Sequence, residues 1–221
     1  MTSLKSSLPS CEQKEQLLEA LTTERQRRRT ENRLAYYVPY IKQKAFHDAG
    51  ALHRERLFMA GNRVGKTLCG AAELAMHLTG QYPDWWTGKR FDKPIRAWAA
   101  GVTNESARDV VQEKLIGPPH RRAEWGQGLI PKDTLGEVSM ARGTADLIDT
   151  ISVLHVTGGY SMLQFKSYSE GRTKWQGVGL EVVWLDEEAP EDLYFEALTR
   201  TNETNGVTNV VRMFLHEGIR V

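Results

Sequence analysis

Cysteine is scarce in this chain of 221 residues. The two cysteines, Cys11 and Cys69, form no CxxC or zinc-ligand spacing, and two cysteines do not make a disulfide scaffold at this length. The six histidines are scattered and include no HExxH pattern. Neither a disulfide framework nor a transition metal held by the protein is therefore expected.

Long apolar runs are also missing. No stretch of about 18 apolar residues occurs that would span a bilayer. The polar start, MTSLKSSLPSCEQKEQ, lacks the apolar core of a secretory signal. The sequence predicts a soluble protein, neither secreted nor bound to a membrane, that stays where it is made.

An excess of charge of either sign is absent, since 29 basic residues face 28 acidic ones and the formal net charge is +1. Global charge therefore argues neither for nor against a nucleic-acid partner, and any such contact would need local basic patches. The candidates are the basic runs within residues 25–29 and 89–93. The alternative for both runs is a solvated helix face and a solvated loop.

The length allows one sizeable core with a small appendage. We expect an N-terminal helical extension over residues 1–35 and one domain over residues 36–221, with no room for a second catalytic domain. Leu17, Leu18 and Leu21 stand at helical spacing, which predicts an amphipathic helix over residues 12–34, laid against the domain and ended by Pro39.

The order of apolar segments within the domain predicts an α/β fold. Buried strands are expected at residues 56–60, 95–100, 181–185 and 207–215, and helices at residues 67–78 and 105–115. Two strand-like runs, 151–157 and 161–167, are joined through Gly158 and Gly159, which is a hairpin signal. Residues 117–136 are expected to be irregular. Helices between buried strands indicate a mostly parallel central sheet flanked by helices.

A phosphate-binding loop stands between the first strand and the helix that follows it. Its residues are Ala60, Gly61, Asn62, Arg63, Val64, Gly65, Lys66 and Thr67. This is a P-loop, or Walker A motif, with alanine in place of the usual first glycine. Backbone N–H groups can wrap a phosphate chain, Lys66 can reach the β- and γ-phosphates, and Thr67 can ligate Mg²⁺.

Four apolar residues followed by acids, VVWLDEE, occupy residues 182–188 in the manner of a Walker B motif. The strand would deliver Asp186 to the edge of the sheet, where its carboxylate can hold a water of the Mg²⁺ shell. Glu187 is placed to orient and deprotonate an attacking water. Because simple phosphate binding needs no general base, this pair of acids predicts a hydrolase.

An aromatic segment, YYVPYIKQKAFH at residues 36–47, precedes the P-loop. The amide of Gln43 can pair with the N6 and N7 edge of adenine, and an aromatic ring can stack on the base. The alternative is a helix that packs its aromatic side chains on the core. Spacing alone favours neither interpretation.

Several sequence motifs, taken together, resemble those of one protein family. PYIKQKAFH ahead of GNRVGKT, the PDWWTGKRF loop, and GRTKWQG before VVWLDEEAP look like the large terminase subunit of tailed bacteriophages, over about residues 36–206. The resemblance implies an ASCE-type P-loop NTPase fold and the ATPase of a viral DNA-packaging motor, using ATP and Mg²⁺. It also implies a homo-oligomeric ring on the portal protein, a small terminase partner and double-stranded DNA as the translocated substrate, in the cytoplasm of the bacterial host.

The same resemblance assigns roles to individual residues. Gln43 becomes the adenine-reading residue, Arg63 a sensor of the γ-phosphate, and Arg172 a finger to a neighbouring subunit's ATP, with a surface salt bridge as the alternative for Arg172. Family members carry a nuclease domain after the ATPase, which we do not expect within these residues. Their coupling motif ends a strand with a polar pair, whereas residues 210–218 contain neither serine nor threonine.

Three other interpretations remain open from the sequence. A helicase-type ATPase would require a second RecA-like domain. A small-molecule kinase would require an acceptor pocket and a lid, and would not need Glu187 beside Asp186. A truncated prophage remnant would bind nucleotide or partner proteins without productive turnover.

Overall fold

The structure, a computed structural model, describes residues 11–61 and 63–213, and its centre is a sheet of seven strands. The strands are β1 (Glu55–Ala60), β2 (Arg96–Gly101), β3 (Leu135–Met140), β4 (Ile148–Leu154), β5 (Tyr160–Ser167), β6 (Val182–Asp186) and β7 (Val207–Met213). The main helices are α1 (Cys11–Glu31), α2 (Ile41–Ala49), α3 (Lys66–Thr79) and α6 (Glu191–Asn202). Short 3₁₀ turns connect them, among them η1 (Leu34–Tyr36), η5 (Tyr168–Glu170) and η6 (Arg172–Trp175).

The sheet order is β1-β7-β6-β2-β5-β4-β3. The first five of these strands are parallel, and β4 and β3 extend the sheet as an antiparallel meander. Strand β7 is inserted between the P-loop strand β1 and the acid-tipped strand β6, which is the additional strand that the term ASCE denotes. The predicted mostly parallel α/β sheet is therefore confirmed, and the carboxyl ends of β1 and β6 lie at one edge.

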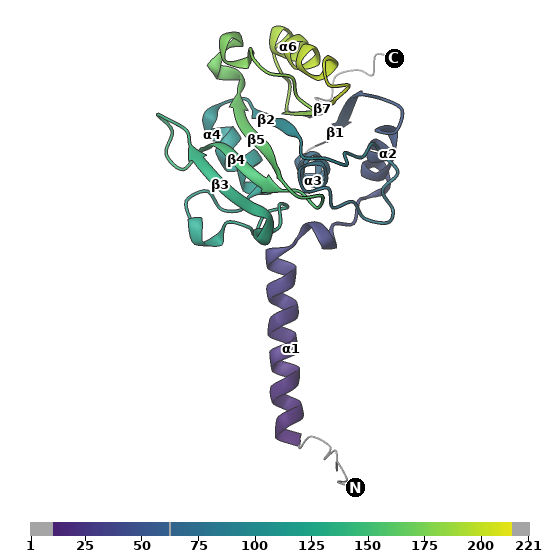
Figure 1. Ribbon diagram of the computed structural model, residues 1–221, viewed down its shortest axis with the longest axis vertical. Helices are drawn as coiled ribbons and strands as arrows, with labels where there is room; N and C mark the ends of the chain where they lie inside the picture. Colours follow the sequence, from purple (N-terminus) through teal and green to yellow (C-terminus); the bar gives the residue numbers. More distant parts are fainter. Residues whose placement is uncertain (1–10, 62, 214–221) are drawn as a thin grey trace.

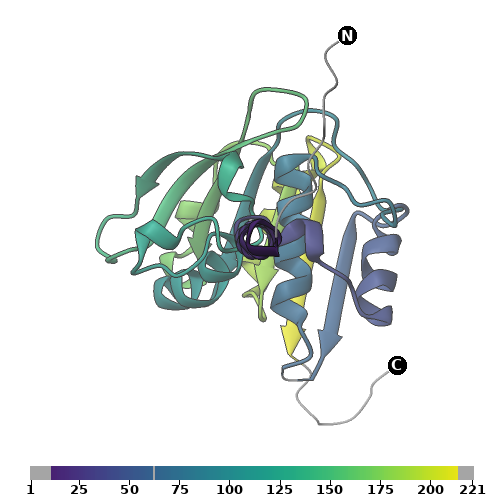
Figure 2. The same ribbon diagram turned by 90° about the horizontal axis from the view of Figure 1, so that it is seen from below.

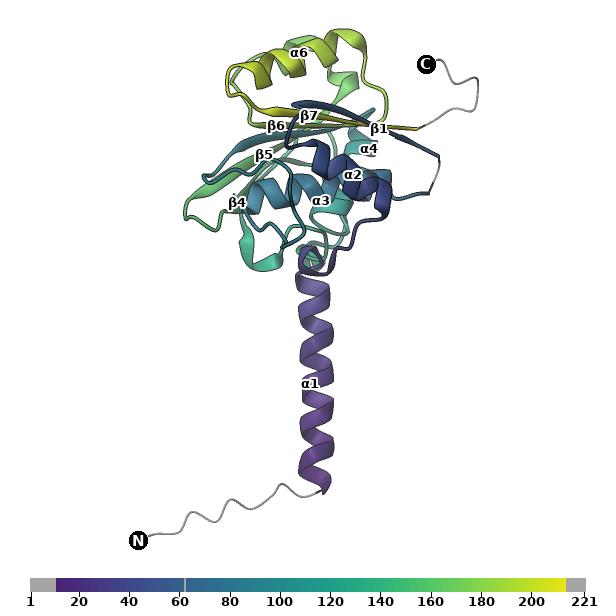
Figure 3. The ribbon, with the colours of Figure 1, turned by 90° about the vertical axis from the view of Figure 1, so that its right-hand side faces the viewer.

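Helices cover both faces of the sheet (Figure 3). Helix α3 runs under the centre of one face beside α2, and α6 lies on the other face (Figures 1 and 3). Gly70 lets α3 approach the sheet closely, because a Cβ at this position would collide with the indole of Trp184 in β6. This packing fixes the start of α3, and with it the P-loop, against β6.

Helix α1 projects away from the body and does not lie against it (Figures 1 and 3), and it is seen end-on in Figure 2. The predicted extent of the helix is close, but its docking is wrong: none of its residues is buried, and Leu17, Leu18 and Leu21 are all more than half exposed. The three leucines make too short an apolar patch to serve as a docking stripe. The helix ends at Glu31, well before Pro39, and ion pairs such as Arg27 with Glu31 support it.

Two further segments differ from expectation. Strand β3 begins at the end of the stretch predicted to be irregular, because it gains its hydrogen bonds from β4 and has little apolar alternation of its own. The helix expected over residues 105–115 runs from Asn104 to Leu115, and its middle, Ala107–Gln112, is π-helical. Thr103 caps it, accepting from the Ser106 N–H at 3.2 Å. Among the described helices, none is long and apolar enough to cross a membrane.

Candidate functional site

The P-loop leaves the end of β1 and enters α3 through two residues in the left-handed region. Arg63 has φ 60° and Gly65 has φ 80°. Glycine is needed at position 65 for a second reason, since a Cβ there would lie 2.8 Å from the Gln43 amide nitrogen. Ala60 is not among the residues with positive φ, which explains why alanine can replace the usual glycine. Asn62 lies outside the described residues.

Lys66 is the first residue of α3, and its side chain is buried. Its ammonium donates to the carbonyl of Gly61 at 2.8 Å, so the charge lies against the loop's own backbone. A buried ammonium with one carbonyl acceptor retains two N–H donors for an anion. The loop is thus arranged to present backbone and side-chain donors to phosphate oxygens.

Thr67 and Asp186 meet across the edge of the sheet although they are 119 residues apart, and their Oγ1 and Oδ2 atoms are 3.4 Å apart. The other carboxylate oxygen of Asp186, Oδ1, is buried and makes no hydrogen bond to the described residues. Burial, and then the nearby charge of Glu187, raise the pKa of Asp186 to about 7. A hydroxyl and an orphaned carboxylate oxygen are the donors that a hard divalent cation takes, so these residues fit Mg²⁺.

Glu187 follows directly and has φ 65°, a left-handed conformation that glutamate rarely adopts. Such strain persists only where the surroundings fix the backbone, and it concentrates at functional sites. One restraint is visible next to it: the hydroxyl of Tyr168 donates to the carbonyl of Asp186 at 2.8 Å. Nothing in the amino-acid pattern singled out Tyr168, because the contact is tertiary.

Gln43 lies beside the P-loop as the resemblance requires, but it also has a structural task. Its Oε1 accepts from the N–H of Tyr40 at 2.8 Å, and its Nε2 donates to the carbonyl of Gly65 at 2.9 Å. One Nε2 hydrogen and one Oε1 lone pair remain for a base edge. Gln43 therefore braces the start of α2 against the start of α3.

A cavity of about 750 Å³ opens between α2, the end of β1 and the P-loop. Its lining consists of aromatic, apolar and polar side chains together with loop backbone: Tyr40, Ile41, Lys42, Gln43, Phe58, Met59, Ala60, Gly61, Arg63 and Val64. The volume is typical of a small-molecule site. An apolar wall with one amide is suited to a planar heterocycle.

Among the described residues, no hydrogen bond or ion pair joins Arg172 to the P-loop or to Asp186. It lies in η6, where its Nε is 3.3 Å from Glu196 of α6, and Glu196 also pairs with Arg200. The side chain of Arg172 is 59% exposed. The salt bridge weighed as the alternative is present. A finger role would need Arg172 to leave Glu196 for another subunit.

Three comparisons bear on this site. A profile of the family described as "Terminase large subunit, T4likevirus-type, N-terminal" matches residues 57–214. The large terminase subunit of Salmonella phage P22 is 39% identical over 234 aligned positions, which cover 93% of this chain and 47% of that protein. The chain thus spans about half the length of the curated relative it matches.

A solved structure of the large terminase from a thermophilic bacteriophage, in complex with ADP, has the same fold. It aligns with 77% of this chain and 38% of its own, with a TM-score of 0.51 and 14% sequence identity. At this identity the likeness concerns the fold, and it agrees with the P-loop NTPase architecture of the sheet.

Proposed function

The chain belongs to the large terminase family, and we propose that it is the ATP-hydrolysing part of a motor that packs double-stranded DNA into a phage procapsid. The observation that carries the proposal is the meeting of Thr67 and Asp186 at the sheet edge, with Glu187 directly following. Two segments that are far apart in the sequence thus bring together two side-chain oxygens that can bind the Mg²⁺ of a Mg·ATP complex. A loop that only bound phosphate would not need the acid pair.

The phosphate chain would lie along the P-loop backbone. Lys66 would donate to a phosphate oxygen with an N–H that Gly61 does not take, since its ammonium already points into the loop. Arg63, exposed within the same loop, is suited to the γ-phosphate. Thr67 and Asp186 would hold Mg²⁺, which when bound neutralises the charge that develops on the phosphates.

Glu187 would act as the general base. A carboxylate accepts the proton of the attacking water as its oxygen approaches the γ-phosphorus, and this requires a fixed position within hydrogen-bond reach. The left-handed backbone at Glu187, held beside the Asp186 carbonyl, supplies that fixed position.

The adenine would occupy the cavity beside α2, with Gln43 at its polar edge. Replacing Gln43 with alanine is expected to narrow the preference for ATP over GTP by about tenfold, the size of effect that one or two lost hydrogen bonds produce. Competition binding of the two nucleotides would measure it. Lys44→Ala, on the same helix but in an exposed ion pair with Asp48, is the control and should keep wild-type selectivity. Unchanged selectivity in Gln43→Ala would remove this residue from base recognition.

The partners follow from the family. We propose a homo-oligomeric ring on the portal protein, a small terminase subunit and double-stranded DNA, all in the host cytoplasm. Arg172 would serve as the finger to a neighbouring subunit's ATP by exchanging its ion pair with Glu196. The Arg172 side chain of this pair is largely exposed, and the buried carboxylate of Glu196 would keep its second partner, Arg200.

Measuring ATP hydrolysis by the purified chain, with and without double-stranded DNA, tests the proposal. We expect Mg²⁺-dependent release of phosphate that DNA stimulates and that rising salt suppresses, because phosphate contacts by a few Lys and Arg side chains are screened. Mg·ATP binding without any turnover would instead indicate the non-productive remnant.

A further inference from the structure

Helix α3 carries a glutamate in its most deeply buried part. Glu73 has no exposed surface and stands between Ala72 and Leu74, which are buried as well. An ionised carboxylate in such a place costs several kcal/mol unless partners offset the lost hydration. The sequence held this signal, since a lone glutamate interrupts an apolar helix stripe, and a buried glutamate is almost always paired.

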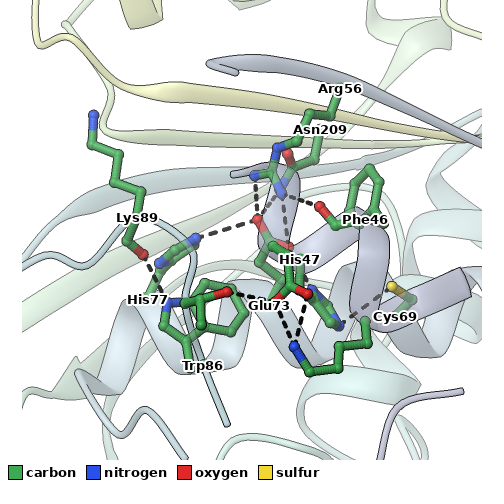
Figure 4. Close-up of polar contacts among 12 residues, drawn as sticks. Phe46, His47, Arg56, Cys69, Glu73, His77, Trp86, Lys89 and Asn209 are labelled. Carbon is green, nitrogen blue, oxygen red and sulfur yellow. Dashed lines mark hydrogen bonds and ion pairs between the residues drawn. The ribbon is translucent and has the colours of Figure 1, made fainter. Parts of the chain in front are cut away.

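Side chains from the sheet and from α2 converge on Glu73 (Figure 4). Arg56 of β1 pairs with both carboxylate oxygens, and Asn209 of β7 donates its amide to Oε1 at 2.9 Å. His47 of α2 places Nδ1 2.7 Å from Oε2. Burial raises the pKa of Glu73, but the charge of Arg56 and the hydrogen bond from His47 outweigh it and hold the pKa well below its usual range. Glu73 is therefore an ionised acceptor.

The tautomer of His47 follows from its neighbours. Because Glu73 accepts, Nδ1 of His47 carries the proton, and Nε2 accepts from the hydroxyl of Tyr37 at 3.1 Å. The thiol of Cys69 lies 3.5 Å from the same Nε2. Cys69, His47 and Glu73 thus resemble a nucleophile, a base and an acid. Burial raises the pKa of Cys69, however, so the sulfur stays a thiol and cannot serve as a nucleophile.

The position of His47 on α2 gives the cluster its functional link. Gln43 and His47 are one turn apart and lie on the same face of α2. Gln43 contacts α3 at Gly65, and His47 contacts it two turns further on, at Glu73. Two polar contacts thus fix both the depth and the tilt of α2. The first turn of α2, together with Tyr40 just before it, forms one wall of the cavity beside the P-loop.

We propose that Glu73 is a positioning residue for the nucleotide base: through His47 it holds α2 at the spacing from α3 that shapes the base side of the cavity. Arg56 and Asn209 anchor the carboxylate to β1 and β7, so that it acts as a fixed point. The proposal rests on the proposed function, because it assumes that this cavity receives a base. Its consequence is selective, since the phosphate contacts come from the P-loop backbone and Lys66. The contact from α2 to this loop is made by Gln43 at Gly65 and does not involve His47.

The test uses His47, because replacing Glu73 would leave Arg56 buried without a partner and threaten folding. Calorimetry would compare the binding of Mg·ATP and of inorganic tripolyphosphate with Mg²⁺. We expect His47→Leu to weaken ATP binding about tenfold, which is the size of effect expected for one lost hydrogen bond to a charged group. Tripolyphosphate binding should change by less than about twofold. His47→Asn, whose amide nitrogen can replace Nδ1, should restore most of the ATP affinity.

If His47 only stabilised the fold, its replacement would weaken the binding of ATP and of tripolyphosphate equally. Ile151→Val in the buried core of β4 serves as the control, since it costs about 1 kcal/mol far from α2 and should leave the ratio of the two affinities unchanged. Equal losses for ATP and tripolyphosphate in His47→Leu, no loss at all, or no rescue by His47→Asn would overturn the positioning role. Failure of the unaltered chain to bind either ligand would instead reject the proposed function, and this proposal with it.

Discussion

Replacing Glu187 with glutamine is expected to lower ATP hydrolysis by on the order of a hundredfold or more while leaving Mg·ATP binding nearly intact. Glutamine keeps the shape of the side chain but cannot take a proton from water. The left-handed backbone at this position should survive, because the hydroxyl of Tyr168 still donates to the Asp186 carbonyl in the variant. Lys66→Ala should behave in the opposite way and weaken binding.

Phosphate release at saturating ATP, together with calorimetric binding of Mg·ATP, measures both effects. Glu188→Gln is the matched control, since it removes the neighbouring carboxylate from an exposed side chain and should leave turnover close to wild type. If the wild type is active and Glu187→Gln turns over ATP equally fast, Glu187 is not the general base. Loss of turnover in Glu188→Gln instead would move the role by one residue.

The parts of the site that the sequence predicted are those encoded locally. A P-loop is a short segment between a buried strand and a helix, so the local sequence alone predicts the positions of Lys66 and Thr67 without any tertiary contact. Asp186 was placed by the apolar run that precedes it. The meeting of Thr67 and Asp186 followed from the rule that parallel strands end at one edge, and the structure has it at 3.4 Å.

What the sequence did not predict depends on distant partners. Glu196 lies 24 residues beyond Arg172, and nothing local pairs them. Strand β3 exists because β4 supplies hydrogen bonds, and its own sequence alternates poorly. For α1, helical spacing of three leucines predicted the helix but not its docking, because docking depends on whether the body offers a complementary apolar surface. Of residues 210–218, where the family's coupling motif is expected, 210–213 belong to β7 and 214–218 lie outside the described residues.

The buried carboxylate of Asp186 is expected to make the stability of the fold depend on pH in an unusual direction. Its pKa in the folded chain, raised to about 7 by burial and then by Glu187, lies above the value of about 3.9 for an unfolded chain. The folded state therefore binds the proton more tightly. The stabilisation is fully present below about pH 4 and is lost as pH rises through about 7. At about 1.4 kcal/mol per pKa unit, ionisation costs the nucleotide-free fold on the order of 4 kcal/mol.

Asp186→Asn should therefore stabilise the nucleotide-free protein at pH 8. The same variant should bind Mg·ATP about tenfold to a hundredfold more weakly. Asparagine removes the buried charge that is costly without a cation, and with it the oxygen donor that favours one. In the wild type, Mg²⁺ competes with the proton for the Asp186 carboxylate, so Mg·ATP should raise the Tm more at pH 8 than at pH 5.5. In Asp186→Asn, Mg·ATP should raise the Tm by the same amount at both pH values. Thermal melts at both pH values, with and without Mg·ATP, measure it. An asparagine variant that melts lower than wild type at pH 8, or that keeps the full pH-dependent gain, would mean that Asp186 is not the cation's carboxylate.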